Sequence, residues 1–367
     1  MKKSLLFAAA GLAGVFLFAG INRTEVSPNG FVTGTPEIRS VSALTFGPDG
    51  ILFVGDSKSA AVFAIDTKDT KRTDKPQPTD IRAFDQKLAD ALGTTKENVT
   101  ILDMVVNPIS KKIYFAVQTA DGSPALLKLE GDKLQAVPMN DVRFSSVALN
   151  NVAAEDAKDA RGRSLRVSTI SDIGYADGKL LVSGLSNKEF SSSFRSIPFP
   201  FTGKQDDASL EMYHASHGRF ETTSPIRTFT TGELNGKKYL IASYTCTPLV
   251  VFPLDELTAG AHIKGRTVAE MGNGNTPVDM VRLSGGGNSF LVLANDRRPV
   301  AKVNYKNIEQ FEGTLTERVA GTAGVTFAVL PLEKVVQLDK LDDSRAIVLQ
   351  KRATGELDLW TSNGQNL

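Results

Sequence analysis

A strand-turn-strand segment recurs six times along the chain, and this repeat constrains the fold more than any other feature. The first copy begins with Val41–Phe46, turns at a Pro-Asp-Gly sequence and resumes as the apolar run Ile51–Asp56. Such a turn between β-rich runs predicts a hairpin, because proline presets φ and glycine accepts a positive φ.

The later copies keep the same order of strands, and their starts lie about 59 residues apart on average. The six copies begin at Val41, Ile101, Ile170, Ile226, Pro277 and Val336. A period of this size with three visible strands is typical of a four-stranded propeller blade with a long outer loop. The sequence therefore predicts an all-β chain with a single β-propeller of six four-stranded blades. The alternative is a ring of seven blades, in which residues 130–170 or 190–225 form the additional blade.

The sixth copy has room for only three strands before Leu367. We expect Gly30–Arg39 to supply the missing strand, which would close the ring and remove its open edges. Residues 22–40 are then the lead-in and closing strand, and residues 41–367 are the propeller. Phe84, Leu88 and Leu92 have helical spacing, so Ile81–Leu92 is predicted to be a helix outside the repeat.

The first 21 residues have the pattern of a secretory signal peptide, with two lysines before an uncharged apolar run. The cleavage signal is poor, because Leu17 or Phe18 stands where signal peptidase requires a small residue. Residues 1–21 therefore predict either a cleaved signal peptide or an uncleaved anchor. We expect a periplasmic or secreted protein, or one anchored in the inner membrane by this segment alone.

The charge balance argues against nucleic-acid binding, and the cysteine content excludes an intramolecular disulfide. The 42 Lys and Arg residues balance 41 Asp and Glu residues, so the basic excess of a nucleic-acid-binding surface is missing. Cys246 is the only cysteine and cannot form an intramolecular disulfide. The expected partner is a small molecule or a periplasmic protein.

The repeat predicts which positions share one face of the ring. In an antiparallel pair the start of the innermost strand and the end of the second strand lie together, here beside the central channel. The third residue of three copies is an aspartate, and polar residues end several second strands. The predicted ligand-binding face consists of Asp56, Asp103, Gln118, Asp172, Asn187, Thr228, Asp279 and Asn295.

Converging carboxylates repel one another unless they share a cation, a proton or an arginine. A hard divalent cation such as calcium, held by Asp103, Asp172 and Asp279, is therefore one hypothesis for this face. The other interpretation is structural: each aspartate caps a local turn or accepts hydrogen bonds from the neighbouring blade.

A second cluster consists of His214 and His217, which are two of the three histidines of the chain, followed by Glu221. Their spacing presents both imidazoles together on one tight turn. With the thiolate of Cys246, one hairpin later, they would suit copper or zinc. The alternative is a surface loop next to a cysteine that packs as a small apolar residue.

Phe46–Asp56 and Asn107–Ala116 resemble the strand-turn-strand units of the broad NHL, YVTN and SMP-30/gluconolactonase-like propellers. The resemblance implies the fold, and members of this group include binding modules as well as enzymes. The N-terminal segment and the polar channel face predict an exported propeller that binds a ligand or partner protein at that face. The resemblance implies an alternative, a lactone or ester hydrolase whose metal is held by Asp103, Asp172, Asp279 and Asn295 and activates water. A copper or redox role of the histidine cluster is a third interpretation.

Overall fold

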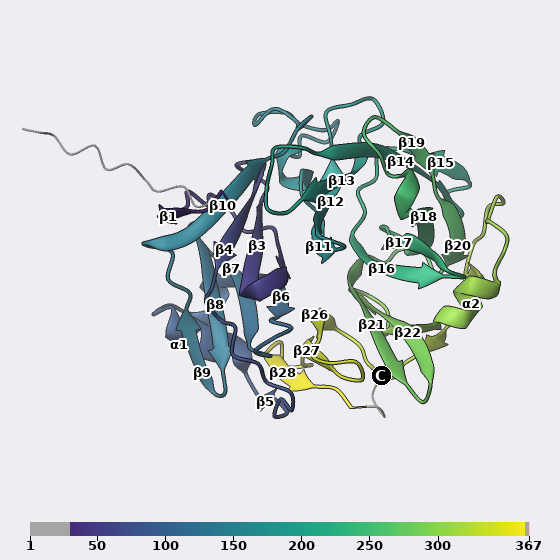
Figure 1. Cartoon of the computed structure of the whole chain (residues 1–367). Helices are drawn as coiled ribbons and strands as arrows, with labels where there is room; N and C mark the ends of the chain where they lie inside the picture. The colour runs from purple at the N-terminus through teal and green to yellow at the C-terminus, as the bar shows by residue number, and fades with distance from the viewer. Residues whose placement is uncertain (1–29, 364–366) are drawn as a thin grey trace, which may run out of the picture.

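The computed structural model describes residues 30–363 and 367, and it confirms the predicted fold class. Antiparallel blades are arranged in a ring, as Figure 1 shows, and cavities lie along its central axis. The predicted signal peptide at residues 1–21 lies outside the described residues. Within the described residues no helix has the length and apolar character needed to cross a membrane.

Six blades are numbered here by the order of their innermost strands along the chain. The innermost strands are β2 (Ala43–Phe46), β6 (Val99–Val106), β11 (Asp172–Ala176), β16 (Thr228–Leu234), β21 (Pro277–Gly285) and β26 (Val335–Lys340). The second strands are β3 (Ile51–Asp56), β7 (Ile113–Thr119), β12 (Lys179–Leu185), β17 (Lys237–Ser243), β22 (Asn288–Asn295) and β27 (Ala346–Lys351). The third strands are β4 (Ala61–Asp66), β8 (Pro124–Glu130), β13 (Ser192–Pro198), β18 (Pro248–Pro253), β23 (Ala301–Asn304) and β28 (Leu357–Thr361).

The fourth strands come from less regular places in the sequence. For blades 1 to 6 they are β10 (Val142–Ala148), β9 (Lys133–Ala136), β14 (Asp206–His214), β20 (Arg266–Glu270), β25 (Ala328–Val329) and β5 (Asp80–Ile81). Four short strands extend the outer edges: β1 (Val32–Gly34), β15 (Arg219–Glu221), β19 (His262–Lys264) and β24 (Ala323–Gly324). The helices are α1 (Phe84–Ala91) and α2 (Tyr305–Gln310).

The blades do not follow one another around the ring in chain order. The innermost strand of blade 1 contacts those of blades 2 and 3, and the innermost strand of blade 2 contacts that of blade 6. The order around the ring is therefore 1, 2, 6, 5, 4, 3, which can be followed in Figure 1. Apolar clusters fill these same junctions: Phe53 of blade 1 packs with Leu180 of blade 3, and Phe115 of blade 2 with Leu349 of blade 6.

Two crossings of the chain produce this order. After β4 the chain runs to blade 6, where β5 pairs with β28, and only then forms blade 2. After β9 it returns along the outer edge of blade 1 as β10, pairs with β4 and continues to blade 3. Blade 1 thus lies between blades 2 and 3.

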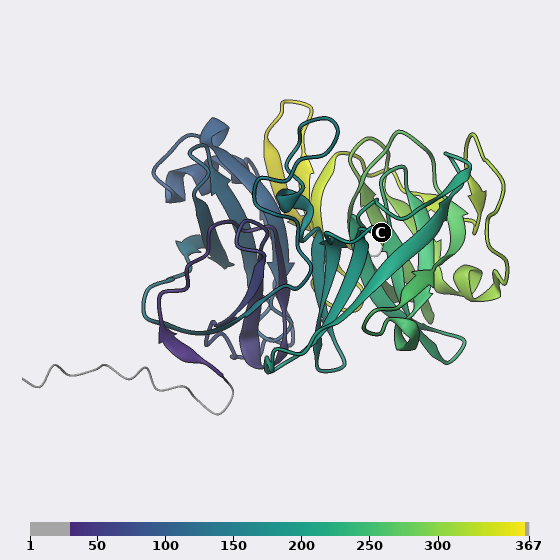
Figure 2. The same cartoon turned by 90° about the horizontal axis from the view of Figure 1, so that it is seen from above.

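The expected closing strand was wrong in its position. Asp80–Ile81 completes blade 6, whereas Val32–Gly34 lies within the predicted segment Gly30–Arg39 and pairs with β10. The reason is the second crossing, because β10 offers a strand edge directly beside the N-terminal segment. Figure 2 shows β1 at the outer edge of the ring. The helix predicted over Ile81–Leu92 is confirmed as α1, with Phe84 and Leu88 fully buried.

Candidate functional site

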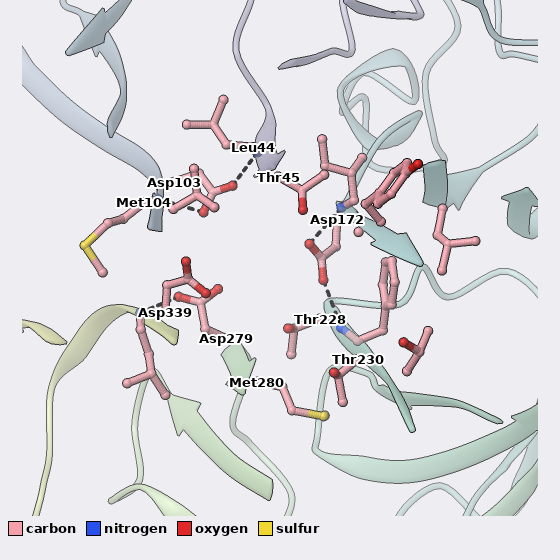
Figure 3. Close-up of a pocket in the computed structure, with 18 residues that line it drawn as sticks. Leu44, Thr45, Asp103, Met104, Asp172, Thr228, Thr230, Asp279, Met280 and Asp339 are labelled. Carbon is pink, nitrogen blue, oxygen red and sulfur yellow. Dashed lines mark hydrogen bonds between the residues drawn. The ribbon is translucent and has the colours of Figure 1, made fainter. Parts of the chain in front are cut away.

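The central channel contains two cavities. A cavity of about 440 Å³ lies at the end where the innermost strands begin, and a second of about 210 Å³ lies farther along the axis. Both are lined by Asp103, Asp172 and Asp279. Figure 3 shows these aspartates around the channel together with Thr228 and Asp339. The polar lining identifies the channel as one candidate site.

Four of these aspartates bridge neighbouring blades. Each carboxylate accepts a hydrogen bond from a backbone N–H on the innermost strand of the next blade, always in the same direction around the ring. The pairs are Asp172 with Phe229 at 2.8 Å, and Asp103 with Leu44, Asp279 with Leu338 and Asp339 with Val106, each at 2.6 Å. These contacts agree with the structural interpretation of the aspartates, because each carboxylate accepts a hydrogen bond from a backbone N–H of the neighbouring blade.

Burial raises the pKa of every carboxyl group in this set, because ionisation in the channel loses the hydration of the carboxylate. The pKa of Asp172 rises to about 7 and that of Asp339 to about 6. The pKa values of Asp103 and Asp279 also rise well above the usual range, first through burial and then through the nearby acidic groups. The channel therefore holds protons at mildly acidic pH.

The aspartates do not form a compact metal-ligand set. Within the described part of the chain, the sole group of three or more His, Cys, Asp or Glu ligand atoms that all lie within 4.8 Å of one another is elsewhere. Asn295, the fourth member of the expected hydrolase set, does not line either cavity and instead contacts Asn275. The residues proposed for a channel hydrolase are thus not brought together.

The other predicted face residues have local roles. Asp56 accepts hydrogen bonds from Arg39 and Ser40. Gln118 donates to Gly122 within its hairpin, and Asn187 is exposed. None of these three residues lines a channel cavity.

Asp339 was missed in the sequence. With the sixth copy beginning at Val336, the repeat places Leu338 at the position equivalent to Asp103, Asp172 and Asp279. Strand β26 has a register shift between Val335 and Gln337, and Asp339 faces the channel instead. An alignment started one residue later would have found it.

The compact group is His214, His217 and Cys246, whose ligand atoms all lie within 4.8 Å of one another. His214 ends β14 of blade 3, and a tight turn with a hydrogen bond from Gly218 N to His214 O carries His217. Cys246 lies in the turn after β17 of blade 4. Strands β14 and β20 are in contact across the two blades, so the ends of separate hairpins converge here.

Glu221 contacts both imidazoles with its two carboxylate oxygens. Its Oε2 lies 3.0 Å from Nδ1 of His214, and its Oε1 lies 2.7 Å from Nδ1 of His217. Although burial opposes ionisation, these hydrogen bonds hold the pKa of Glu221 well below its usual range. An ionised carboxylate can only accept, so both Nδ1 atoms donate, and in the neutral imidazole the lone pair then lies on Nε2.

The second ring nitrogen of His214, Nε2, makes no hydrogen bond within the described residues. His214 is 2% exposed, and its Nε2 is buried without a hydrogen-bond partner. Buried polar atoms are almost always paired. The unpaired Nε2 of His214, next to a second imidazole and a thiol, is therefore available to a ligand. Carboxylate–histidine pairs of this kind orient the histidines of metal sites.

Cys246 stands in a backbone conformation that favours glycine. Its φ is +67°, and the next residue, Thr247, has a φ of +58°. Thr247 N donates to Tyr244 O, which makes Cys246 the third residue of a turn. A side chain in this region costs about 1–2 kcal/mol, and strained residues cluster at functional sites.

Comparisons with known proteins add little. Neither a family model nor a curated protein matches the chain. Solved structures that align with it include a bifunctional GH43-CE protein of Bacteroides eggerthii, with 13% identity and a TM-score of 0.37 over 72% of this chain and 33% of that one. The extracellular domains 1–2 of Drosophila semaphorin 1a align with 10% identity and a TM-score of 0.38, over 91% and 88% of the two chains. Those of semaphorin 1b align with 11% identity and a TM-score of 0.37, over 87% and 72%. Similarity at this level carries no argument about function.

Proposed function

We propose that this propeller binds one transition-metal ion, copper or zinc, through Nε2 of His214, Nε2 of His217 and Sγ of Cys246. The observation that carries the proposal is the convergence of these three residues' ligand atoms within 4.8 Å while Glu221 occupies both Nδ1 atoms. Two imidazoles and a thiolate are ligands that copper and zinc prefer, whereas calcium and magnesium prefer oxygen. The protein is proposed to act in the periplasm or outside the cell.

The burial of His214 and the backbone conformation of Cys246 support a metal site rather than a surface loop next to a cysteine that packs as a small apolar residue. His214 is buried, and a buried histidine with one unpaired nitrogen loses a hydrogen bond that water would have given it. Cys246 also keeps a strained turn position that a glycine would occupy without cost. Metal binding would compensate both features at once.

The test is the metal content of the purified full chain. After dialysis against copper(I) under anaerobic conditions, or against zinc, we expect one equivalent of metal per chain. Alanine substitution of His214, His217 or Cys246 is expected to abolish retention. The matched control is His262→Ala, because His262 also pairs with a carboxylate, Glu211, at 2.8 Å but belongs to no ligand group. Equal retention by the wild type and all three variants would refute the proposal.

A second proposed function is the binding of a small polar ligand at the mouth of the channel. The cavity of about 440 Å³ has the size of a ligand pocket and is lined by Arg227 as well as by carboxylates. Gln337, which is 8% exposed and lines this cavity, has an Oε1 atom without a hydrogen-bond partner among the described residues. Membership of the NHL, YVTN and SMP-30-like group stays a prediction.

A further inference from the structure

The number of protein ligands distinguishes among the ions that the His214, His217 and Cys246 site would accept. Within the described residues no further His, Cys, Asp or Glu joins this group. Structural zinc sites are closed by four protein ligands, and a three-ligand set leaves the zinc open. Two histidines and one cysteine in a trigonal arrangement are instead the donor set of copper sites that transfer electrons.

The position of His217 gives such an ion a connection to the surface. The His217 side chain is 42% exposed, whereas His214 is buried. An ion bound to both would lie only one imidazole ring below the solvent. A partner that docks over His217 would approach the metal without any rearrangement of the fold.

Two exposed arginines lie beside His217. Arg219 lies two residues along and its side chain is 71% exposed. Arg318 is exposed, and its side chain packs against Gly218, where an added Cβ would come within 2.9 Å of it. Two acidic side chains lie next to these arginines: Glu317, directly before Arg318, is exposed, and Glu221, whose Oε1 lies 3.2 Å from Nε of Arg219, is 9% exposed. Among the exposed side chains at the approach to His217, the two arginines therefore outnumber Glu317. Steering by such charges favours negatively charged partners.

We propose that the ion is copper, that it cycles between Cu(II) and Cu(I), and that electrons pass through the exposed His217 imidazole to or from an anionic one-electron partner docked against Arg219 and Arg318. The proposal rests on the proposed metal site. In each half-cycle one electron moves: Cu(II) becomes Cu(I) while the partner is oxidised by one electron, and the reverse step reduces the partner. The thiolate and both imidazoles stay bound, and no proton transfer is required for balance.

The first measurement is spectroscopic. The full chain is loaded anaerobically with copper(I) and then oxidised with hexacyanoferrate(III). We expect an intense visible absorption from thiolate-to-Cu(II) charge transfer that disappears on reduction with ascorbate and returns on reoxidation. Cys246→Ser is expected to lack the band, and His262→Ala is expected to keep it.

The second measurement separates the docking surface from the metal. The rate of oxidation by anionic hexacyanoferrate(III) is compared with that by cationic tris(phenanthroline)cobalt(III). In the double variant Arg219→Glu and Arg318→Glu, we expect the rate with the anion to fall about tenfold at low salt, and the rate with the cation to rise. The control is Lys71→Glu with Arg72→Glu, which makes the same change of charge on the exposed connection between β4 and β5.

The outcomes are distinguishable. Retained copper without a reversible visible band, or copper lost on oxidation with a Cys246 disulfide between chains, would overturn the redox proposal and leave the metal site intact. Rates that are equal for the charge-reversed variant and its control would overturn the docking surface. A chain that retains no metal in dialysis would refute the proposed function itself.

Discussion

Oε2 of Glu221 lies 3.0 Å from Nδ1 of His214, whose second ring nitrogen is buried and without a partner in the described structure. The pair fixes the tautomer of His214, because the carboxylate accepts and the imidazole must donate from Nδ1. In the proposed metal site the ion would bind at Nε2, the ring nitrogen that does not contact Glu221. The same carboxylate orients His217, so one residue prepares two ligands.

Replacing Glu221 by glutamine is therefore expected to weaken metal binding without removing a ligand. The side-chain amide of the Glu221→Gln variant would hydrogen-bond less strongly to the imidazoles and could present its N–H to one of them. Loss of such a supporting carboxylate typically lowers metal affinity about 10- to 100-fold. Competition titration with a chromophoric chelator measures the change. Glu211→Gln, which alters the equivalent pair with His262, is the matched control and should leave the affinity unchanged.

Glycine at position 246 is expected to separate stability from metal binding. Cys246 has a φ of +67°, so Cys246→Gly relieves strain while removing the thiolate. After subtraction of the chain entropy that glycine adds to the unfolded state, we expect the metal-free protein to gain up to about 1 kcal/mol relative to Cys246→Ala. Urea denaturation of the two variants provides the comparison. An alanine variant as stable as the glycine variant would mean that the turn is not strained.

The strand units of the blades could be predicted from sequence, because they depend on local chemistry. The Pro-Asp-Gly turn and the apolar run Ile51–Asp56 specify their hairpin within about ten residues of chain. The order of the blades could not be predicted in this way. That order depends on pairing between distant segments, such as β5 with β28, and β5 is a strand of two residues with no pattern of its own.

The residues of the candidate sites also differ in whether local sequence was enough to predict their position. Asp103, Asp172 and Asp279 could be located in the channel because they occupy equivalent positions in the repeat, whereas the shifted register of β26 hid Asp339. The spacing of His214 and His217 is local and was visible. Glu221 follows on the same hairpin, so its contact with both imidazoles is local as well. The approach of the two histidines to Cys246 depends on contact between blades 3 and 4, which no local pattern specifies.

The channel aspartates are expected to make the protein less stable as pH rises. The raised pKa of Asp172, about 7, means that the native state keeps a proton that the unfolded chain releases near pH 4. The native state then binds more protons between these values, so the free energy of unfolding falls as pH increases through this window.

Asp172→Asn, which is uncharged at every pH, is expected to reduce this fall. Urea denaturation between pH 5 and pH 8 measures it, within the window set by the raised pKa. The matched control is Asp177→Asn on the same hairpin, because Asp177 is exposed and pairs only with Lys238 at the surface. Parallel stability curves for wild type and Asp172→Asn would show that Asp172 does not hold the proton.

Asp69 is expected to have the opposite effect on the free energy of unfolding, which it should raise as pH increases. It lies after β4 and accepts hydrogen bonds from Ser110 and Tyr114 of blade 2, and its Oδ1 lies 3.0 Å from Nζ of Lys112. Although burial opposes ionisation, these partners lower the pKa of Asp69. Its contribution to stability is therefore present above the unfolded pKa near 4 and is lost as pH falls through the lower native pKa.

Asp69→Asn should destabilise the junction of blades 1 and 2 at neutral pH by about 3 kcal/mol, because Lys112 loses its buried partner. The exposed pair of Arg72 and Asp74 provides the control, since both side chains are more than three-quarters exposed. Asp74→Asn is expected to change the free energy of unfolding by less than about 0.5 kcal/mol. Burial outweighs the hydrogen bonds to the carboxylate at Asp172, whereas the partners of Asp69 outweigh its burial. Asp69→Asn should therefore lose its effect in acid, where Asp172→Asn approaches wild-type stability. Equal effects of Asp69→Asn at pH 7 and pH 3 would contradict this assignment.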